Sequence, residues 1–462
     1  MKKIVSIALA VLLLLSLFAG CKKDTNSPVA ASVASADGES GAVGEESSAG
    51  DEKVIHLLTD LGNNAKRAGA ADSQYSAQVV MDQFLASKDI LPEGYRLEVE
   101  VMPTDETEFQ TRLKRLRTEI MSGKGPDIYV LSSANYSPLF PQERVFPNTK
   151  KAMEDGFFLN LDSYMETAQF MEFDDMNPTV MAAGCTSEGR FILPTRFTFS
   201  ATKVLEPVTD AGAGWFDVIN GTDEVLAGSY AVSAALGFES IFEETVDTET
   251  KMLTFSEEEL YDAVAMTLKL YGSDPANFPK SETVGIAPVD FSSVMPDFCW
   301  GPQWKDIATY IPMRNREGGV TATVTSYIAI NRNTSYPDEA FRVVDLMMGK
   351  KFQSAQKFWE NGNTGPTSAA AVFGWAKGVC VYDDFLTKIR PMNYDLYLDD
   401  EMYPVYCELR DKITDARIMN HVDQAIDDLY FNAQVNSMTP GDELKKYVSE
   451  EYRKMVLMAG EL

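Results

Sequence analysis

The sequence predicts an α/β protein with more than one domain. Strand, helix and strand patterns follow one another between Val54 and Leu131, an order that favours a lobe in which helices cover a sheet. Packed structure is expected to begin near Val54, which leaves about 409 of the 462 residues. That length is too great for one apolar core and is enough for two or three domains.

The first elements are read from apolar spacing. The apolar run 54–58 predicts a buried strand, and the segment 60–64 with its glycine predicts the loop after it. A helix is expected over 76–84, and alternating apolar residues predict a strand over 96–102. These elements would form the beginning of the first lobe.

The next helix and strand have clear signals at both ends. The apolar stripe of the helix is spaced four, three and four residues apart, at Phe109, Leu113, Leu116 and Ile120. Gly123 is a natural helix stop, the Gly-Pro pair at 125–126 predicts a turn, and 127–131 predicts a short buried strand.

Later helices are marked by their capping residues. Ser256 and Glu259 form a capping box, and Phe255 with Leu260 can staple it. Pro337 starts a helix that Gly349 ends. A last helix follows the turn 439–442 and carries the apolar positions Leu444, Val448 and Met455.

The first residues resemble a bacterial lipoprotein signal. Lys2 and Lys3 precede an apolar run from Ile4 to Phe18, and small residues then lead into Cys21. In the lipobox that this pattern resembles, the cysteine thiol is acylated and becomes the mature N-terminus, although Phe18 stands where that pattern usually has Leu. We expect residues 1–20 to be a signal peptide and Cys21 to be lipidated, which places the protein on the outer face of the cell membrane.

Composition describes the tether and the surface. Residues 21–53 are rich in Ser, Ala, Gly and acid and are expected to form a disordered acidic tether. The chain has a formal charge of −28, so nucleic acid is an unfavourable partner. No later segment reaches about 18 consecutive apolar residues, so no other membrane span is expected.

Catalytic and metal sites find little support. The two histidines, His56 and His421, fall in an apolar strand and in a predicted helix, and no hydrolase, metalloprotease, phosphate-binding or EF-hand motif is present. No CxxC or His-Cys spacing predicts zinc. We therefore expect no enzyme activity, no cofactor and no metal. The remaining cysteines allow three full disulfide pairings or free thiols, which the sequence leaves open: Cys185, Cys299, Cys380 and Cys407.

Three stretches resemble the family 1 extracellular solute-binding proteins of bacterial ABC importers, the class that includes the maltose-binding protein. The helix, GKGPDI turn and strand over 115–131 look like the family's best short marker. The segment 189–194 resembles its entry into the first interlobe crossover. The segments 310–313, 318–319 and 327–331, followed by Pro337-Asp-Glu-Ala340, resemble its return crossover.

The resemblance implies a two-lobed, periplasmic-binding-protein-like (type II) fold. Each lobe would be a sheet flanked by helices, and hinge crossovers would join the lobes. It implies residues 54–195 plus 312–362 for lobe 1 and residues 196–311 plus 363–462 for lobe 2. It also implies a monomer that captures a small solute, an oligosaccharide, in the interlobe cleft and delivers it to ABC permease subunits.

Candidate solute contacts combine aromatic rings with polar side chains, because sugars present both apolar faces and hydroxyls. The candidates are Asn63, Asn64, Asn135, Tyr136, Arg196, Phe197, Trp215, Trp300 and Trp304. Structural alternatives stand beside several of them: Trp300 and Trp304 as core packing, the amides as ordinary turn residues, and Arg196 as an ion-pair partner. Trp215 follows Gly212 and Gly214 in a predicted loop. Asp127, within the family-like turn, is expected to have a structural hydrogen-bonding role.

Other functions remain as alternatives at this point. A surface-anchored glycan-degrading enzyme is one, since paired carboxylates for glycoside hydrolysis are spaced in the fold and not in the sequence. A binding protein for a non-sugar solute such as a peptide is another, and a surface scaffold or adhesin is a third.

Overall fold

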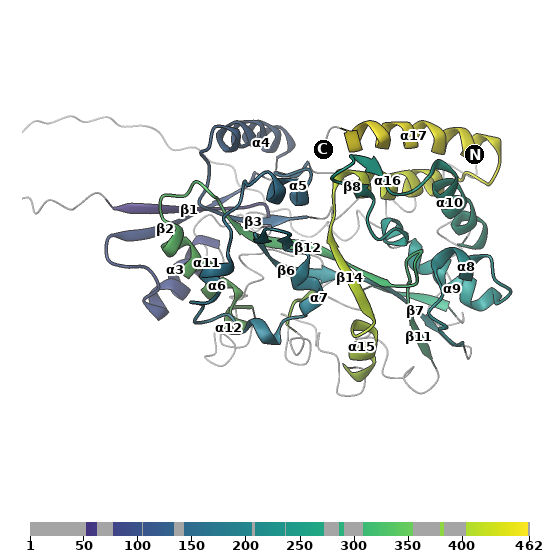
Figure 1. The fold of residues 1–462 in the computed structure, drawn as a ribbon, viewed down its shortest axis with the longest axis horizontal. Helices are drawn as coiled ribbons and strands as arrows, with labels where there is room; N and C mark the ends of the chain where they lie inside the picture. Colours follow the sequence, from purple (N-terminus) through teal and green to yellow (C-terminus); the bar gives the residue numbers. More distant parts are fainter. Residues whose placement is uncertain are drawn as a thin grey trace, which may run out of the picture. The chain divides into compact units, whose positions relative to one another are not determined.

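The computed structural model describes residues 52–61, 77–103, 105–133, 143–205, 208–235, 237–271, 286–290, 308–353, 379–382 and 403–460 (Figure 1). Cys21 and Cys299 lie outside these residues. Among the described cysteines, Cys185, Cys380 and Cys407 are free thiols. A search of the described helices for a stretch long and apolar enough to cross a bilayer finds none.

The first lobe is built on a mixed sheet with the strand order β13-β6-β12-β3-β1-β2. Strand β1 runs parallel to its neighbours β2 and β3. Strand β12 runs antiparallel to β3 and β6, and β13 runs antiparallel to β6. A further strand, β14, pairs with β12 in parallel. The bounds are β1 Lys53–Thr59, β2 Tyr95–Val101, β3 Ile128–Ser132, β6 Ile192–Thr198, β12 Val320–Ile330, β13 Val379–Cys380 and β14 Ile413–Ile418.

Helices cover both faces of this sheet because its strands alternate their apolar residues. Ile55 and Leu57 of β1 face the core that contains α3 and α11, whereas Leu58 faces the core under α4. The helices of this lobe are α3 Ala77–Lys88, α4 Glu106–Met121, α5 Thr149–Glu154, α6 Asp162–Met165, α7 Pro178–Ala182, α11 Pro337–Met348, α12 Lys350–Gln353 and α15 Tyr403–Arg410, with the 3-10 turn η1 Phe173–Asp175 and the hairpin β4 Cys185–Thr186 and β5 Gly189–Arg190.

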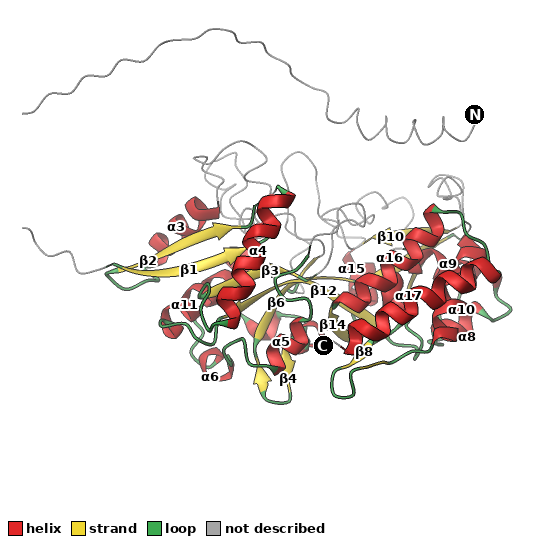
Figure 2. Cartoon of the chain, turned by 90° about the horizontal axis from the view of Figure 1, so that it is seen from above, coloured by secondary structure: helices red, strands yellow, loops and turns green. Residues whose placement is uncertain are grey.

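The second lobe has its own apolar core around a small antiparallel sheet, β10-β7-β11. Helix α17 packs against both α10 and α16 in this lobe (Figure 2). The elements are β7 Ser200–Val204, α8 Trp215–Ile219, α9 Glu224–Ala234, η2 Phe238–Ile241, β8 Val246–Asp247, β9 Met252–Leu253, α10 Glu257–Tyr271, β10 Ile286–Asp290, β11 Thr309–Pro312, α16 His421–Val435 and α17 Asp442–Gly460.

The chain passes between the two cores along three described routes. Strand β6 leads into β7, β11 leads back into β12, and β14 leads into α16. The first two routes are the segments that the sequence predicts as crossovers. The lobe boundaries stay a prediction.

Several sequence signals are confirmed in detail. Helix α4 carries the predicted buried stripe, and Gly123 just beyond it has a φ of +75°, a left-handed conformation that glycine adopts without strain. The capping box forms, with the Glu259 amide donating to Ser256 Oγ at 3.2 Å and the Ser256 amide donating to Glu259 Oε2 at 2.7 Å. Helix α11 runs from Pro337 to its C-cap Gly349.

Asp127 has the structural role expected of it. Its carboxylate accepts from the amide of His56 on β1 at 2.8 Å and from the Thr334 hydroxyl at 2.5 Å. These bonds tie β1, the turn before β3 and the segment after β12 together. The family-like turn is therefore explained by folding.

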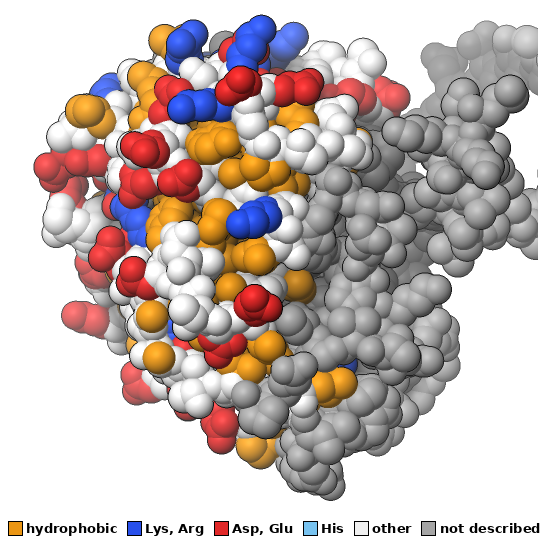
Figure 3. Space-filling model, turned by 90° about the vertical axis from the view of Figure 1, so that its right-hand side faces the viewer, with side chains coloured by type: hydrophobic (Ala, Val, Ile, Leu, Met, Phe, Trp, Pro, Cys, Tyr) orange, Lys and Arg blue, Asp and Glu red, His pale blue; other side chains and the backbone are white. Residues whose placement is uncertain are grey.

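The acidic balance of the sequence is visible on the surface. Figure 3 shows acidic side chains spread over one face, around a band of hydrophobic side chains, with Lys and Arg gathered mainly toward its upper end. The exposed large apolar side chains include Leu270 on α10 and Leu457 on α17.

Candidate functional site

The carboxyl ends of two strands, β3 and β14, meet at one point of β12. Strand β3 pairs with Ser326–Ile330 and β14 pairs with Val320–Val324, on the same edge of β12 and in opposite directions. Their carboxyl ends therefore point toward each other and meet at Thr325, whose carbonyl accepts from the Ser133 amide at 3.0 Å. Ligands of open α/β sheets bind outside carboxyl strand ends at such reversals of strand order. We call this point the junction.

A carboxyl group and a guanidinium lie at the junction. Asp60, at the end of β1, accepts from the Ser132 amide at 2.8 Å. Burial raises the pKa of Asp60 to about 7, and the positive charge of Arg144 offsets part of that rise. Arg144 donates to the Met419 carbonyl at 3.1 Å and to Gln424 Oε1 at 3.4 Å. The first lobe thus reaches the segment that starts α16 of the second lobe.

The crossover strand β12 is polar on one face although all of it is buried. Thr321, Thr323 and Thr325 alternate along that face, each no more than 3% exposed. Thr323 donates to Glu239 Oε1 at 3.4 Å, and Asn315 donates to Thr321 at 3.0 Å. The opposite face packs in the first core through Val320, Ala322 and Val324. Hydroxyl groups therefore line the crossover beneath the junction.

A buried ion cluster joins β14 to the second lobe beside the junction. Arg417 on β14 lies 3.2 Å from Asp423 and 3.7 Å from Glu239, and it donates to the Phe242 carbonyl at 2.9 Å. Burial, and then the neighbouring Glu239 carboxylate, raises the pKa of Asp427 well above its ordinary value. The Glu239 amide donates to Asp427 Oδ1 at 3.0 Å, so Asp427 belongs to the same buried group of charged side chains as Arg417.

The N-terminus of α16 is capped beside this cluster. Asn420 and Asp423 form a capping box, in which Asn420 Oδ1 accepts from the Val422 amide at 2.7 Å and Asp423 Oδ2 accepts from the Asn420 amide at 2.7 Å. Thr245 donates to the same Asp423 carboxylate at 2.6 Å. The cap thereby joins α16 to the loop after η2.

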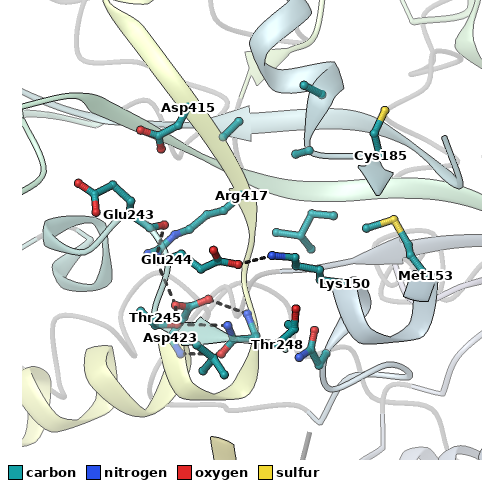
Figure 4. Close-up of a pocket in the computed structure, with 17 residues that line it drawn as sticks. Lys150, Met153, Cys185, Glu243, Glu244, Thr245, Thr248, Asp415, Arg417 and Asp423 are labelled. Atoms are coloured by element: carbon teal, nitrogen blue, oxygen red, sulfur yellow. Dashed lines mark hydrogen bonds and ion pairs between the residues drawn. The ribbon is translucent and has the colours of Figure 1, made fainter. Parts of the chain in front are cut away.

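A pocket of about 340 Å³ lies next to the junction, along β14 (Figure 4). Its walls come from α5, from β4, from the loop 243–248 and from β14. Figure 4 shows Cys185 and Met153 on one side of β14, and Glu244 beside Lys150. Both charged and apolar side chains line it, so it has no single binding chemistry.

The described residues assemble no metal site. No group of three or more His, Cys, Asp or Glu side chains is placed to hold an ion within the part of the chain that the structure describes. The carboxylates at the junction and around the pocket take part in hydrogen bonds and ion pairs with the protein itself: Asp60, Asp415, Asp423, Glu239, Glu243 and Glu244.

The structure places three of the predicted contact residues in buried positions. Arg196 lies on β6 beside Ser326 of β12 and is 8% exposed. Phe197 follows it and packs in the first core. Trp215 opens α8, is fully buried in the second core and packs edge-on against Phe216, with ring centroids 5.1 Å apart. The other predicted contacts lie outside the described residues: Asn63, Asn64, Asn135, Tyr136, Trp300 and Trp304.

Sequence reasoning did not single out the junction residues Asp60, Arg144 and Gln424. Asp60 had a usable signal, since it directly follows a predicted buried strand. The alternation of Thr321, Thr323 and Thr325 could also have been noticed in the sequence, because a buried strand rarely carries hydroxyl groups along one whole face. Arg144 and Gln424 had no local signal, since their contact joins positions 280 residues apart.

No protein-family model and no curated protein matches the chain. Among solved structures, an extracellular solute-binding protein of family 1 from Alicyclobacillus acidocaldarius matches with a TM-score of 0.50 at 12% identity, over 88% of this chain and 98% of that one. The designed cysteine esterase ECH19 matches with a TM-score of 0.50 at 13% identity, over 89% of this chain and 99% of that one. A galacto-N-biose- and lacto-N-biose I-binding protein from Bifidobacterium longum matches at 10% identity with a TM-score of 0.47, over 89% of this chain and 98% of that one.

These likenesses cover nearly the whole length of the matched structures. The chain therefore has the α/β, two-lobed fold of the family 1 extracellular solute-binding proteins, as the sequence resemblance implied. At this level of identity the likeness concerns the fold alone.

Proposed function

We propose that the protein is a lipid-anchored extracellular solute-binding protein. It captures a small solute between its lobes and delivers the solute to the permease of an ABC transporter. The observation that carries the proposal is the junction, where β3 and β14 end at a single point of the crossover strand β12 and Arg144 of the first lobe reaches Gln424 of the second. A ligand at that point would contact both lobes at once and would favour the closed arrangement.

The solute that we propose is an oligosaccharide. Carboxylate, guanidinium and amide groups at the junction, from Asp60, Arg144 and Gln424, can accept from and donate to sugar hydroxyls. We propose that Asn63, Asn64, Asn135 and Tyr136 add polar contacts from the loops after β1 and β3. We propose that Trp300 and Trp304 cover the apolar faces of the sugar rings. The core positions of Phe197 and Trp215 suit packing.

The anchor completes the proposed role. Acylation of Cys21 and the acidic tether over 21–53 would hold the monomeric binding protein close to its permease on the outer face of the membrane. Tethering raises the effective concentration of one partner at the other, which favours transfer of a captured solute. The lobe boundaries near residues 195 and 312 belong to the same proposal, whereas β13 and α15, beyond the predicted boundary at 362, pack in the first core.

A ligand panel tests the proposal. The full-length chain is titrated with oligosaccharides, peptides and other small solutes, and the melting temperature and tryptophan fluorescence are followed. We expect oligosaccharides to raise the melting temperature, and Asp60→Asn and Gln424→Ala to weaken that effect. A response to peptides alone would refute the carbohydrate assignment, and turnover of a glycan into products would refute the transport role.

A further inference from the structure

Three residues in one short segment of the first lobe make polar contacts to the second lobe. Arg144 reaches the Met419 carbonyl and Gln424, as described above. Lys150 on α5 forms an ion pair with Glu244 (Figure 4). Thr248 donates to Glu154 Oε1 at 3.1 Å. The last two contacts lie beside the pocket and join α5 to the loop after η2.

Both sides of these contacts are held by packed structure. On the first-lobe side, Asn148 caps α5 and Thr149 donates to the Tyr327 hydroxyl of β12 at 3.2 Å. On the second-lobe side, Thr245 of the loop after η2 donates to Asp423 of α16 at 2.6 Å, and Arg417 of β14 donates to the Phe242 and Glu243 carbonyls at 2.9 and 3.3 Å. Lys150 and Glu244 are therefore each fixed to packed structure on their own side, so a change in lobe orientation changes the distance between them.

The pocket explains why these contacts affect lobe orientation. It leaves about 340 Å³ between α5 and β4 on one side and β14 with the loop 243–248 on the other. Ile418 of β14 packs against the apolar cluster that includes Met153 of α5, whereas α5 reaches the loop 243–248 through the polar contacts Lys150–Glu244 and Glu154–Thr248. An exposed ion pair is worth about 1 kcal/mol or less. That is a small term in folding, but it shifts a two-state equilibrium between lobe orientations appreciably.

We propose that Lys150–Glu244 and Glu154–Thr248 form an interlobe latch that sets solute affinity without touching the solute. The latch holds α5 against the loop after η2 in the lobe arrangement in which Arg144 of the first lobe contacts Gln424 of the second. Breaking it lowers the population of that arrangement, and the apparent affinity falls by the same factor. The effect on affinity rests on the proposed function, whereas the latch itself is a property of the lobes.

Charge reversal with restoration tests the latch. Lys150→Glu and Glu244→Lys each place like charges together, and the double variant restores the pair in the opposite sense. Lys151→Glu is the matched control, because Lys151 pairs with Asp155 of the same helix at 2.8 Å and does not span the lobes. All four variants are made in the full-length chain. Their melting temperatures are measured first, so that only variants as stable as the wild type are compared.

Cys185 reports the state of the pocket in the absence of any solute. Its half-buried thiol lines the pocket, whereas Cys407 on α15 is half-buried elsewhere and serves as an internal reference. The rate of alkylation by N-ethylmaleimide is followed at each cysteine by peptide mass spectrometry. We expect roughly two- to fivefold faster alkylation of Cys185 in each single reversal, a wild-type rate in the double variant and in Lys151→Glu, and an unchanged Cys407 rate. Equal Cys185 rates in all variants would overturn the latch.

Affinity for the best solute of the panel is the second measurement. We expect each single reversal to weaken binding by roughly two- to fivefold, and the double variant to restore it. Unchanged affinity together with faster Cys185 alkylation would overturn the control of affinity by the latch. Failure of every solute in the panel would count against the proposed function and would leave the alkylation result intact.

Discussion

Asp60 is a carboxyl group whose surroundings favour its protonated form more than water does. It lies at the end of β1, where burial removes it from water and raises its pKa from 3.8 to about 7. The Ser132 amide and the nearby Arg144 stabilise the ionised form, but burial outweighs them. A group with a raised folded-state pKa makes stability depend on pH.

Asp60→Asn should remove that dependence. Well below pH 4 Asp60 is protonated in both the folded and the unfolded wild type, so the stability difference from Asp60→Asn does not change with pH there. As the pH rises toward about 7, the unfolded chain releases its proton first, and the wild type loses stability relative to Asp60→Asn. The measurement is the difference in melting temperature between the two proteins from pH 4 to pH 8. A constant difference over that range would contradict the burial of the carboxyl group.

Arg417 illustrates the opposite case, a buried cation that balances buried acids. It lies within 4 Å of both Asp423 and Glu239 and also holds the Phe242 carbonyl. Removing one partner of a buried ion pair leaves the other charged and desolvated, which costs about 3–5 kcal/mol.

Arg417→Ala should therefore destabilise the protein by about 3 kcal/mol or more in urea unfolding. Arg115→Ala is the matched control, because the Arg115 side chain is 77% exposed in its pair with Glu119. We expect the control to change stability by less than about 0.5 kcal/mol. Similar losses in the two variants would show that the Arg417 cluster is solvated.

At the scale of elements, the regular spacing of apolar residues made the helices and strands of the first lobe predictable. The stripe of α4, the glycine beyond it and the apolar run of β1 are local patterns with one physical meaning each. The structure confirms the elements that they predict, with ends shifted by a few residues. The Ser256 capping box and the Pro337 start of α11 are local in the same way.

The junction could not be predicted so well, because it arises from pairing. Strands β3 and β14 are far apart in the sequence, and only their shared edge on β12 brings Ser133 and Met419 together. Trp215 shows the converse problem. Gly212 and Gly214 predicted a loop, yet Gly214 is the N-cap of a helix whose first residue enters the second core. Composition alone does not distinguish a loop from a helix start.

The N-terminus of α16 offers a test of one element. Asn420→Ala removes the acceptor for the Val422 and Asp423 amides and a bond to Thr245, so we expect a loss of about 1–2 kcal/mol. Asn420→Asp keeps the acceptor and should retain most of the stability. The comparison uses urea midpoints, with hydrogen exchange at the first turn of α16 as the local measurement. Wild-type exchange in Asn420→Ala would mean that water replaces the cap without cost.

At the scale of the whole molecule, the protein has two apolar cores joined by few chain crossings. The first core combines β1, α3 and α11 and continues under α4, and the second combines α8, α9, α10, α16 and α17. A binding protein that closes on a solute needs lobes that stay folded while their orientation changes. Separate cores meet that need, since motion at the crossovers breaks little apolar packing.

Separate cores also predict separate responses to damage. Trp215→Ala deletes a fully buried side chain of the second core and should cost about 3–5 kcal/mol there. Leu57→Ala, the matched truncation in the first core, should cost about 2–5 kcal/mol in that lobe. Hydrogen exchange at increasing denaturant measures each core. We expect Trp215→Ala to reduce protection of α9, α10 and α17 while β1, β3 and α4 keep theirs, and Leu57→Ala to do the reverse. Loss of protection in both cores together would show that the crossovers couple the lobes into one folding unit. Breaking the latch contacts would then not be enough to let the lobes move.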